Sequence, residues 1–384
     1  MRAANLVPSR APRYRRPLAV VALAGLLVAA CGSSDPDGGA SGGEQPQALT
    51  GGPTGTLRLG YFPNITHAPA IVAVEDGTFA DALGAGIDLQ PHTLNSGTEA
   101  IEALFSGATD AAFVGPNPAI NGFAQSGGEA LRIVAGTTSG GAALVVRDGI
   151  DAPDDLIGTT LATPALGNTQ DVALRSWLAG QGIDATTEGG ADVSVRPQEN
   201  ADTLTAFVDG AIDGAWVPEP WATRLVLEGG GHVLVDEATL WEGGRFVTTQ
   251  LVVAASYLED HPALVRALIA GLLDSIDTVN ADPAAAQAAV NDGIEAITGK
   301  RLADATLAGA WAKLTFTPDP VPGSLEGSKE HAVAIDLLEP VDLSAIYDLT
   351  LLNQELSDRG QPPVAGLGDR PVGGGRRIHP GPNR

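Results

Sequence analysis

Short apolar runs alternate with longer stretches of helical periodicity from Thr56 to Ala135. The helical stretches repeat apolar residues at three- and four-residue spacing, as in Gly97–Phe105, where Ile101 and Phe105 share one face. We expect strands at Leu57–Tyr61, Ile87–Gln90, Ala111–Val114 and Leu131–Ala135, and helices through about Ala73, at Gly97–Phe105 and at Pro116–Ala124. Strands separated by helices predict parallel pairing and right-handed crossovers.

The segment Thr137–Gly141 interrupts this pattern, and a second alternation follows it. Its expected strands are Ala142–Val146, Thr160–Ala162, Val193–Val195, Gly214–Val217 and Val233–Val235, and its expected helices are Gln170–Leu178, Ala201–Val208 and Pro220–Leu227. This block has the size of one small α/β domain.

A strand at Leu251–Ala255 precedes a region that is almost entirely helical. The expected helices are Pro262–Val279, Pro283–Ile297, Ala303–Leu314, Leu325–Leu338 and Leu349–Leu356. They need a sheet to pack against, and the first block supplies one. The sequence therefore predicts two α/β lobes, with residues 55–140 and 250–358 in lobe 1 and residues 141–249 in lobe 2. Two crossings are expected, near Ser139–Gly141 and near Thr248–Thr249, and the glycines at the first suit a hinge.

The N-terminal 30 residues have the composition of a secretory signal. They contain five arginines and no acidic residue, and the apolar run Leu18–Ala30 leads directly to Cys31, the only cysteine. Small residues before a cysteine resemble a bacterial lipobox, so we expect lipidation of Cys31 and an extracytoplasmic, membrane-anchored protein; a stray thiol is the alternative. Residues 31–54 are expected to form a flexible tether, and residues 359–384, rich in Gly, Pro and Arg, a disordered tail.

The chain is strongly acidic, with a formal net charge of −24. Without the five leader arginines, 17 basic residues face 46 acidic ones, which is a charge of −29. Such a surface repels nucleic acid and anionic lipid, so we expect neither as a partner. With one cysteine, the fold depends on apolar burial instead of disulfides.

Polar side chains follow successive predicted strands, where the next helix begins. Asn64, Thr66 and His67 follow the first strand. The remaining candidates are Ser96, Gly97, Thr98, Asn117, Thr138, Ser139, Asn168, Thr169 and Glu219. Each position alone is ordinary turn and cap chemistry. Together at one edge of two sheets, they predict a cleft of hydroxyls, amides and helix N-termini that suits a small polar or anionic group.

Catalytic and cofactor motifs are missing from the sequence. It has no Gly-x-Ser-x-Gly elbow, no Walker-type loop and no Gly-x-Gly-x-x-Gly fingerprint. His67, Glu99 and Glu219 could in principle bind a metal, but the six histidines show no metal-ligand spacing. Nothing specific brings Ser96 to His67 as a nucleophile to its base. We therefore expect no enzyme activity, no metal and no cofactor.

Four segments resemble a known family: Gly60–Ala70, Ala103–Ala112, Phe207–Pro220 and Ala254–Pro262. Together they are similar to the extracytoplasmic solute-binding proteins of bacterial ABC importers, of the nitrate/sulfonate/taurine type. The resemblance covers about Leu57 to Leu356. It implies a type II periplasmic-binding-protein-like fold, a monomer that closes on a small solute, and a membrane permease as partner.

The resemblance also assigns ligand contacts and leaves the ligand open. It carries the ligand pocket to Asn64, Thr66, His67, Ser96, Thr98, Asn117, Asn168, Thr169 and Glu219. Aliphatic sulfonates, taurine, nitrate and bicarbonate are the implied solutes. The pattern Pro63-Asn64-x-x-His67 is also similar to binders of pyrimidine thiamine precursors, whose ligand amine Glu219 could pair. An enzyme that uses His67 and a protein-binding lipoprotein scaffold are the remaining alternatives.

Overall fold

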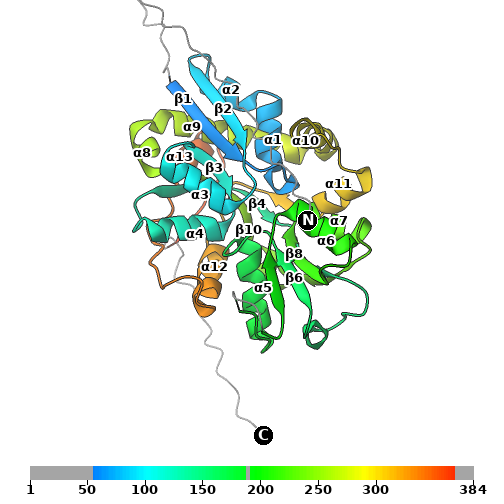
Figure 1. The fold of residues 1–384 in the computed structure, drawn as a ribbon. Coiled ribbons are helices and arrows are strands. Elements are labelled where there is room, and N and C mark those ends of the chain that lie inside the picture. Colours follow the sequence, from blue (N-terminus) through cyan, green and yellow to red (C-terminus); the bar gives the residue numbers. More distant parts are fainter. Residues whose placement is uncertain (1–54, 187–190, 368–384) are drawn as a thin grey trace, which may run out of the picture. The chain divides into compact units, whose positions relative to one another are not determined.

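The computed structural model describes residues 55–186 and 191–367, which form two β-sheets covered by helices (Figure 1). Both sheets belong to one compact unit. The predicted signal peptide, Cys31, the tether and the tail beyond residue 367 lie outside the described residues. The first part of the predicted tail is folded, because Val364 exchanges two hydrogen bonds with the side chain of Asn353. No described helix has both the length and the hydropathy to cross a bilayer.

The first sheet has the strand order β11-β4-β10-β3-β1-β2. Its strands are β1 (Gly55–Tyr61), β2 (Ile87–Thr93), β3 (Ala111–Val114), β4 (Leu131–Gly140), β10 (Val247–Ala254) and β11 (Leu314–Phe316). The predicted parallel pairing holds for β1 with β2 and with β3. It is wrong for β4, because β10 returns from the second sheet and inserts between β3 and β4, antiparallel to both.

The second sheet has the order β7-β6-β8-β5-β9. Its strands are β5 (Ala142–Val146), β6 (Thr160–Thr163), β7 (Ser194–Pro197), β8 (Gly214–Pro218) and β9 (His232–Asp236). The strand β6 is parallel to β7 and β8, whereas β5 is antiparallel to β8 and β9. Buried side chains of α5 (Thr169–Gly180), α6 (Asn200–Val208) and α7 (Trp221–Leu227) complete its two core clusters.

Helices pack on both faces of the first sheet. One face carries α1 (Ala68–Glu75), α2 (Thr78–Leu83), α9 (Pro262–Ala281), α10 (Pro283–Thr298), α11 (Asp304–Trp311) and α13 (Thr350–Asp358). The other carries α3 (Gly97–Ser106), α4 (Pro116–Gln125) and α12 (Pro322–Ala334). The sequence pattern did not predict α2, α8 (Ala255–Asp260) or β11, because elements of three to six residues are too short to show a period.

The two connections between the sheets differ from their predicted places. The segment Thr137–Ser139 does not interrupt the strand, since β4 continues to Gly140 and β5 begins at Ala142. The first crossing is thus Gly140-Gly141, with φ of +86° and +76°, a region that favours glycine. The second crossing lies before Thr248, because β10 already begins at Val247 and the link from β9 occupies residues 237–246.

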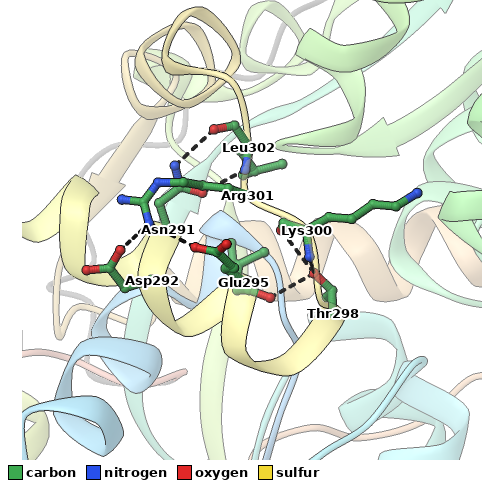
Figure 2. A network of polar contacts seen from close by, with 8 residues as sticks. Asn291, Asp292, Glu295, Thr298, Lys300, Arg301 and Leu302 are labelled. Carbon is green, nitrogen blue, oxygen red and sulfur yellow. Dashed lines mark hydrogen bonds and ion pairs between the residues drawn. The ribbon is translucent and has the colours of Figure 1, made fainter.

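A polar network fixes the link between α10 and α11. Buried Asn291 accepts a hydrogen bond from Leu302 N at 2.8 Å and donates one to Leu302 O at 2.9 Å. Figure 2 shows Arg301 turned back toward Asp292 and Glu295 of α10. These contacts set where α11 begins, and α11 then packs against α7 of the second lobe.

Candidate ligand-binding cleft

A small cavity of about 50 Å³ lies where the strand ends of the two sheets meet. The first lobe contributes Phe62, Asn64, Thr66, His67, Asn95, Ser96, Gly97, Gly115, Pro118, Thr248 and Thr249, and the second contributes Pro164, Asn168, Thr169, Gln170, Asn200 and Pro218. No Asp, Glu, Lys or Arg is among these lining residues. The cavity therefore offers neutral hydrogen-bonding groups in place of ion pairs.

The turn after β1 supplies the first set of lining side chains. A short 3-10 helix, Ile65–His67, follows the strand and leads directly into α1. Asn64, Thr66 and His67 are all buried there. The Thr138 hydroxyl donates to Thr66 O at 2.7 Å and so ties this turn to β4.

His67 is held as a neutral ring. Its Nδ1 accepts a hydrogen bond from Phe62 N at 3.3 Å, and the Phe62 ring packs against it with 4.6 Å between centroids. Burial lowers the pKa of His67 to about 3. A neutral imidazole that accepts at Nδ1 carries its proton at Nε2. The side chain can therefore donate one hydrogen bond without adding charge.

Three helices begin at the cavity wall: α3 at Gly97, α5 at Thr169 and α6 at Asn200. The first backbone N–H groups of a helix have no partner within the helix and carry partial positive charge. Ser96 caps α3 by accepting from Glu99 N, whereas Asn168 makes no such side-chain cap for α5. The cavity thus faces several backbone donors.

Two buried polar atoms of lining residues have no hydrogen-bond partner among the described residues. They are Asn200 Oδ1 and Thr249 Oγ1. Buried polar groups are nearly always paired in folded proteins, so each unpaired one needs an explanation, and a ligand that supplies the missing partner is one such explanation. Their position supports a role for this cavity in binding.

Hydrogen bonds join the two lobes around the cavity. Trp221 Nε1 of α7 donates to Asn64 Oδ1 at 3.0 Å. On the other side, Asn121 Nδ2 donates to Gly167 O at 3.3 Å, and Thr98 Oγ1 lies 3.5 Å from Asn168 Oδ1. A solute in the cavity would thus contact both lobes.

Seven of the twelve predicted ligand-binding residues line this cavity. They are Asn64, Thr66, His67, Ser96, Gly97, Asn168 and Thr169. Their role in binding stays a prediction. The structure nevertheless brings them together from both sheets, as the strand-end argument requires.

The other five predicted residues do not line the cavity. Thr98 bonds Asn168, and Asn117 Nδ2 donates to Ser328 O, so both side chains have structural partners. Thr138 and Ser139 are buried within β4 because the strand extends to Gly140.

Glu219 is the fifth predicted residue that does not line the cleft cavity. Its carboxylate accepts from the Thr223 hydroxyl at 2.9 Å and from Thr223 N at 3.0 Å, and it lines a second cavity. Burial raises the pKa of Glu219, while the bonds from Thr223 and the charge of Lys313 oppose that rise.

Ten lining residues were not predicted, namely Phe62, Asn95, Gly115, Pro118, Pro164, Gln170, Asn200, Pro218, Thr248 and Thr249. Thr248 and Thr249 reach the cavity because antiparallel β10 places its amino end at the carboxyl edge of β1 and β3. The sequence pattern did not show this direction. Asn200 could have been found, since it directly precedes the predicted helix Ala201–Val208.

Metal ligation has no support from the geometry of the described residues. No three His, Cys, Asp or Glu side chains gather closely enough within residues 55–186 and 191–367 to hold an ion.

This arrangement of two sheets is the type II periplasmic-binding-protein fold. The alkanesulfonate-binding protein SsuA from Xanthomonas axonopodis pv. citri, bound to MOPS, superposes with a TM-score of 0.61 at 19% identity, covering 74% of this chain and 94% of that one. The nitrate-binding protein NrtA from Synechocystis PCC 6803 superposes with a TM-score of 0.63 at 16% identity, covering 79% of this chain and 89% of that one.

Residues 50–291 match the NMT1-like family, and the chain belongs to that family. It is 30% identical over 219 residues to the taurine-binding periplasmic protein of Escherichia coli K12, covering 56% of this chain and 64% of that protein. It is 24% identical over 248 residues to the bicarbonate-binding protein CmpA of Synechococcus sp. PCC 6301, covering 57% of this chain and 53% of that protein. The chain therefore matches between half and two thirds of the length of these relatives.

Proposed function

We propose that this protein is the solute-binding component of an ABC importer. It captures a small polar or anionic solute of the sulfonate, taurine, nitrate or bicarbonate type and delivers it to a permease. The observation that carries the proposal is a cavity between two lobes, lined by neutral donors and helix N-termini. The names of the relatives, which include taurine-, bicarbonate- and nitrate-binding proteins, support the same class.

The cavity suits an anion without a lysine or arginine beneath it. Backbone N–H groups at the starts of α3 and α5 and the Nε2–H of His67 supply hydrogen bonds, and helix N-termini favour negative charge. Because no carboxylate lines the cavity, an entering anion meets no repulsion there. The small volume favours a compact solute. The lipid anchor at Cys31 belongs to the same proposal and keeps the protein beside its permease.

The geometry supports binding better than catalysis. His67 Nδ1 already accepts a hydrogen bond from Phe62 N, so the ring has no free basic nitrogen to act on a substrate. The pyrimidine-precursor alternative requires Glu219 at a ligand amine, but Glu219 is bonded to Thr223 and does not line the cleft cavity.

Thermal-shift and calorimetric titration against taurine, ethanesulfonate, nitrate, bicarbonate and an aminopyrimidine test the proposal. We expect one of the anions to stabilise the protein, since a ligand at a hundred times its Kd adds about 2.7 kcal/mol. Stabilisation by the aminopyrimidine alone would move the assignment to the precursor binders. No response to any of them would contradict a solute receptor of this type.

For His67, we expect replacement by alanine to weaken binding of the anion by about tenfold to a hundredfold, because a hydrogen bond to a charged group is lost. The wild-type affinity should stay constant between about pH 6 and pH 8, since the lowered pKa keeps the ring neutral throughout. Titration calorimetry across this range measures both. An affinity that rises as the pH falls through 6.5 would show instead that the charged ring binds the solute.

Trp221→Phe is expected to lower the affinity for the same anion by about threefold to tenfold, because it removes the hydrogen bond from Trp221 Nε1 to Asn64. The substitution retains an aromatic ring at this position. The bond exists only when the lobes meet, so its loss disfavours the closed form. Trp177→Phe is a matched control, since Trp177 packs on Trp216 within the second lobe. Equal effects of the two substitutions would contradict a role for the interlobe bond.

A further inference from the structure

A second cavity, of about 320 Å³, lies between α7 and α11, on the strand ends of β5 and β9. It shares no lining residue with the cleft cavity. Its walls come from both lobes, and Figure 1 shows α7 and α11 as neighbours. Its volume falls at the lower end of the range for small-molecule sites.

The walls of this cavity are mostly apolar. They include Ala143, Ala222, Val226, Leu227 and Val233. Leu227 and Val233 are 54% and 44% exposed, which is high for large apolar side chains. Apolar groups at an accessible cavity provide area for the hydrocarbon part of a ligand.

Two carboxylates and one ammonium group give the cavity its polarity. Lys313 Nζ lies 3.6 Å from Asp236 Oδ2, and both side chains are about half exposed. Glu219 is 4% exposed, and no ion pair of the described residues includes it. One carboxylate is therefore left over, and it is the buried one.

The chemistry of Glu219 selects a cation. A buried carboxylate that makes no ion pair gains strongly from a cation in direct contact with it. The charge of Lys313 acts on Glu219 only from beyond ion-pair distance, since Lys313 Nζ lies beside Asp236. Each carboxylate oxygen of Glu219 accepts one hydrogen bond from Thr223 and can accept more, and an alkylammonium group has three N–H donors. A bare divalent metal fits less well, because it needs several oxygen ligands and the neighbouring wall is apolar.

We propose that this second cavity binds a small hydrophobic primary amine, with its ammonium on the Glu219 carboxylate and its hydrocarbon chain against α7 and β9. The site is separate from the solute cleft and does not depend on which solute the cleft binds.

Titration of the full chain with n-hexylammonium chloride tests the proposal, with hexanoate and methylammonium as probes of charge and chain. We expect saturable binding of hexylammonium and at least about tenfold weaker binding of the other two. Glu219→Gln should lower the affinity for hexylammonium by about tenfold or more, because a neutral amide replaces the carboxylate. Ala305→Phe should abolish binding, since exposed Ala305 on α11 lines the cavity and a phenyl ring would fill it.

Glu228→Gln is the matched control for charge. Glu228 also belongs to the α7 region but pairs with Arg224 and does not line the cavity, so hexylammonium binding should be unchanged. Ala305→Phe keeps the test valid if Glu219→Gln folds poorly, because it alters only an exposed position. The proposal is overturned if hexylammonium does not bind, if hexanoate or methylammonium binds equally well, or if a folded Glu219→Gln or Ala305→Phe variant retains full affinity.

Discussion

Gly136→Ala is expected to destabilise the protein by about 3 kcal/mol or more. Gly136 lies buried in β4, and a Cβ there would stand 2.5 Å from Asp319 C and 2.8 Å from Pro320 N. These are backbone atoms, which cannot rotate away as a side-chain tip can. Gly136 N also donates to Pro318 O at 2.9 Å, so any displacement of this segment breaks a buried hydrogen bond.

Gly180→Ala is the matched control, since Gly180 is the last residue of α5 and no atom lies within 4 Å of the place that an added methyl group would take. Alanine there should be neutral or stabilising by up to about 1 kcal/mol, from helix propensity. Denaturant unfolding of both variants gives the two free energies. Similar values for them would show that the chain segment at Asp319 is not packed on β4 as described.

Because of the titration of Glu237, the free energy of unfolding should fall as the pH rises. Glu237 lies in the second crossing between the sheets and is 1% exposed. Trp216 Nε1 donates to Oε2 at 2.7 Å, and Trp241 Nε1 donates to Oε1 at 3.3 Å. Burial raises the pKa of Glu237 from 4.5 to about 7, although the two tryptophan bonds oppose this rise.

The direction of this pH dependence is set by the number of protons that the folded and unfolded states bind. Between pH 4.5 and about 7 the folded protein keeps the Glu237 proton and the unfolded chain loses it, so the free energy of unfolding falls as the pH rises. One pKa unit corresponds to about 1.4 kcal/mol, which gives a loss on the order of 3 kcal/mol across the window and a constant value above it.

Comparison with Glu237→Gln isolates this contribution from the other carboxylates. The amide keeps an acceptor for one tryptophan N–H and has no proton to lose, so the stability difference between wild type and variant should shrink or reverse as the pH rises toward 7. Denaturant unfolding followed by tryptophan fluorescence measures the difference at each pH. A difference that does not vary with pH would mean that Glu237 titrates normally.

Most helices and strands were predictable, because periodicity, capping residues and prolines within each segment mark where it begins and ends. The strand β3 has the predicted bounds Ala111–Val114. The helices α3, α4, α9 and α10 begin at the predicted residue and end one or two residues later than predicted, and α5 is one residue longer at its start and two at its end. Capping residues and prolines marked the starts of several of these helices, as at Ser96 and Pro262. Helix α11 was predicted to run to Leu314, yet it ends at Trp311, because Leu314 pairs with Gly140 of β4 instead.

Part of the candidate site was predictable for the same reason. Asn64, Ser96 and Asn168 each follow a strand and stand at or near the start of a helix, and parallel strands bring such positions to one edge. Glu219 also follows a strand, but the side of the turn to which its carboxylate points is set by Thr223 and by the packing of α7. Position in the chain therefore placed it near the lobe interface, but Glu219 lines the second cavity and not the cleft cavity.

The sequence alone determined the α/β class, the division into two blocks of strands and helices, and the neutral hydrogen-bonding character of the candidate ligand-binding residues. These depend on periodicity and caps within a few residues of each other. Only the tertiary structure decided that β10 enters between β3 and β4, that Thr248 and Thr249 face the cavity, and that Glu219 faces a different one. The first two features depend on the pairing of β10 with strands more than a hundred residues away in the chain, whose order and direction no local pattern encodes. The third depends on the packing of α7 and the bonds from Thr223.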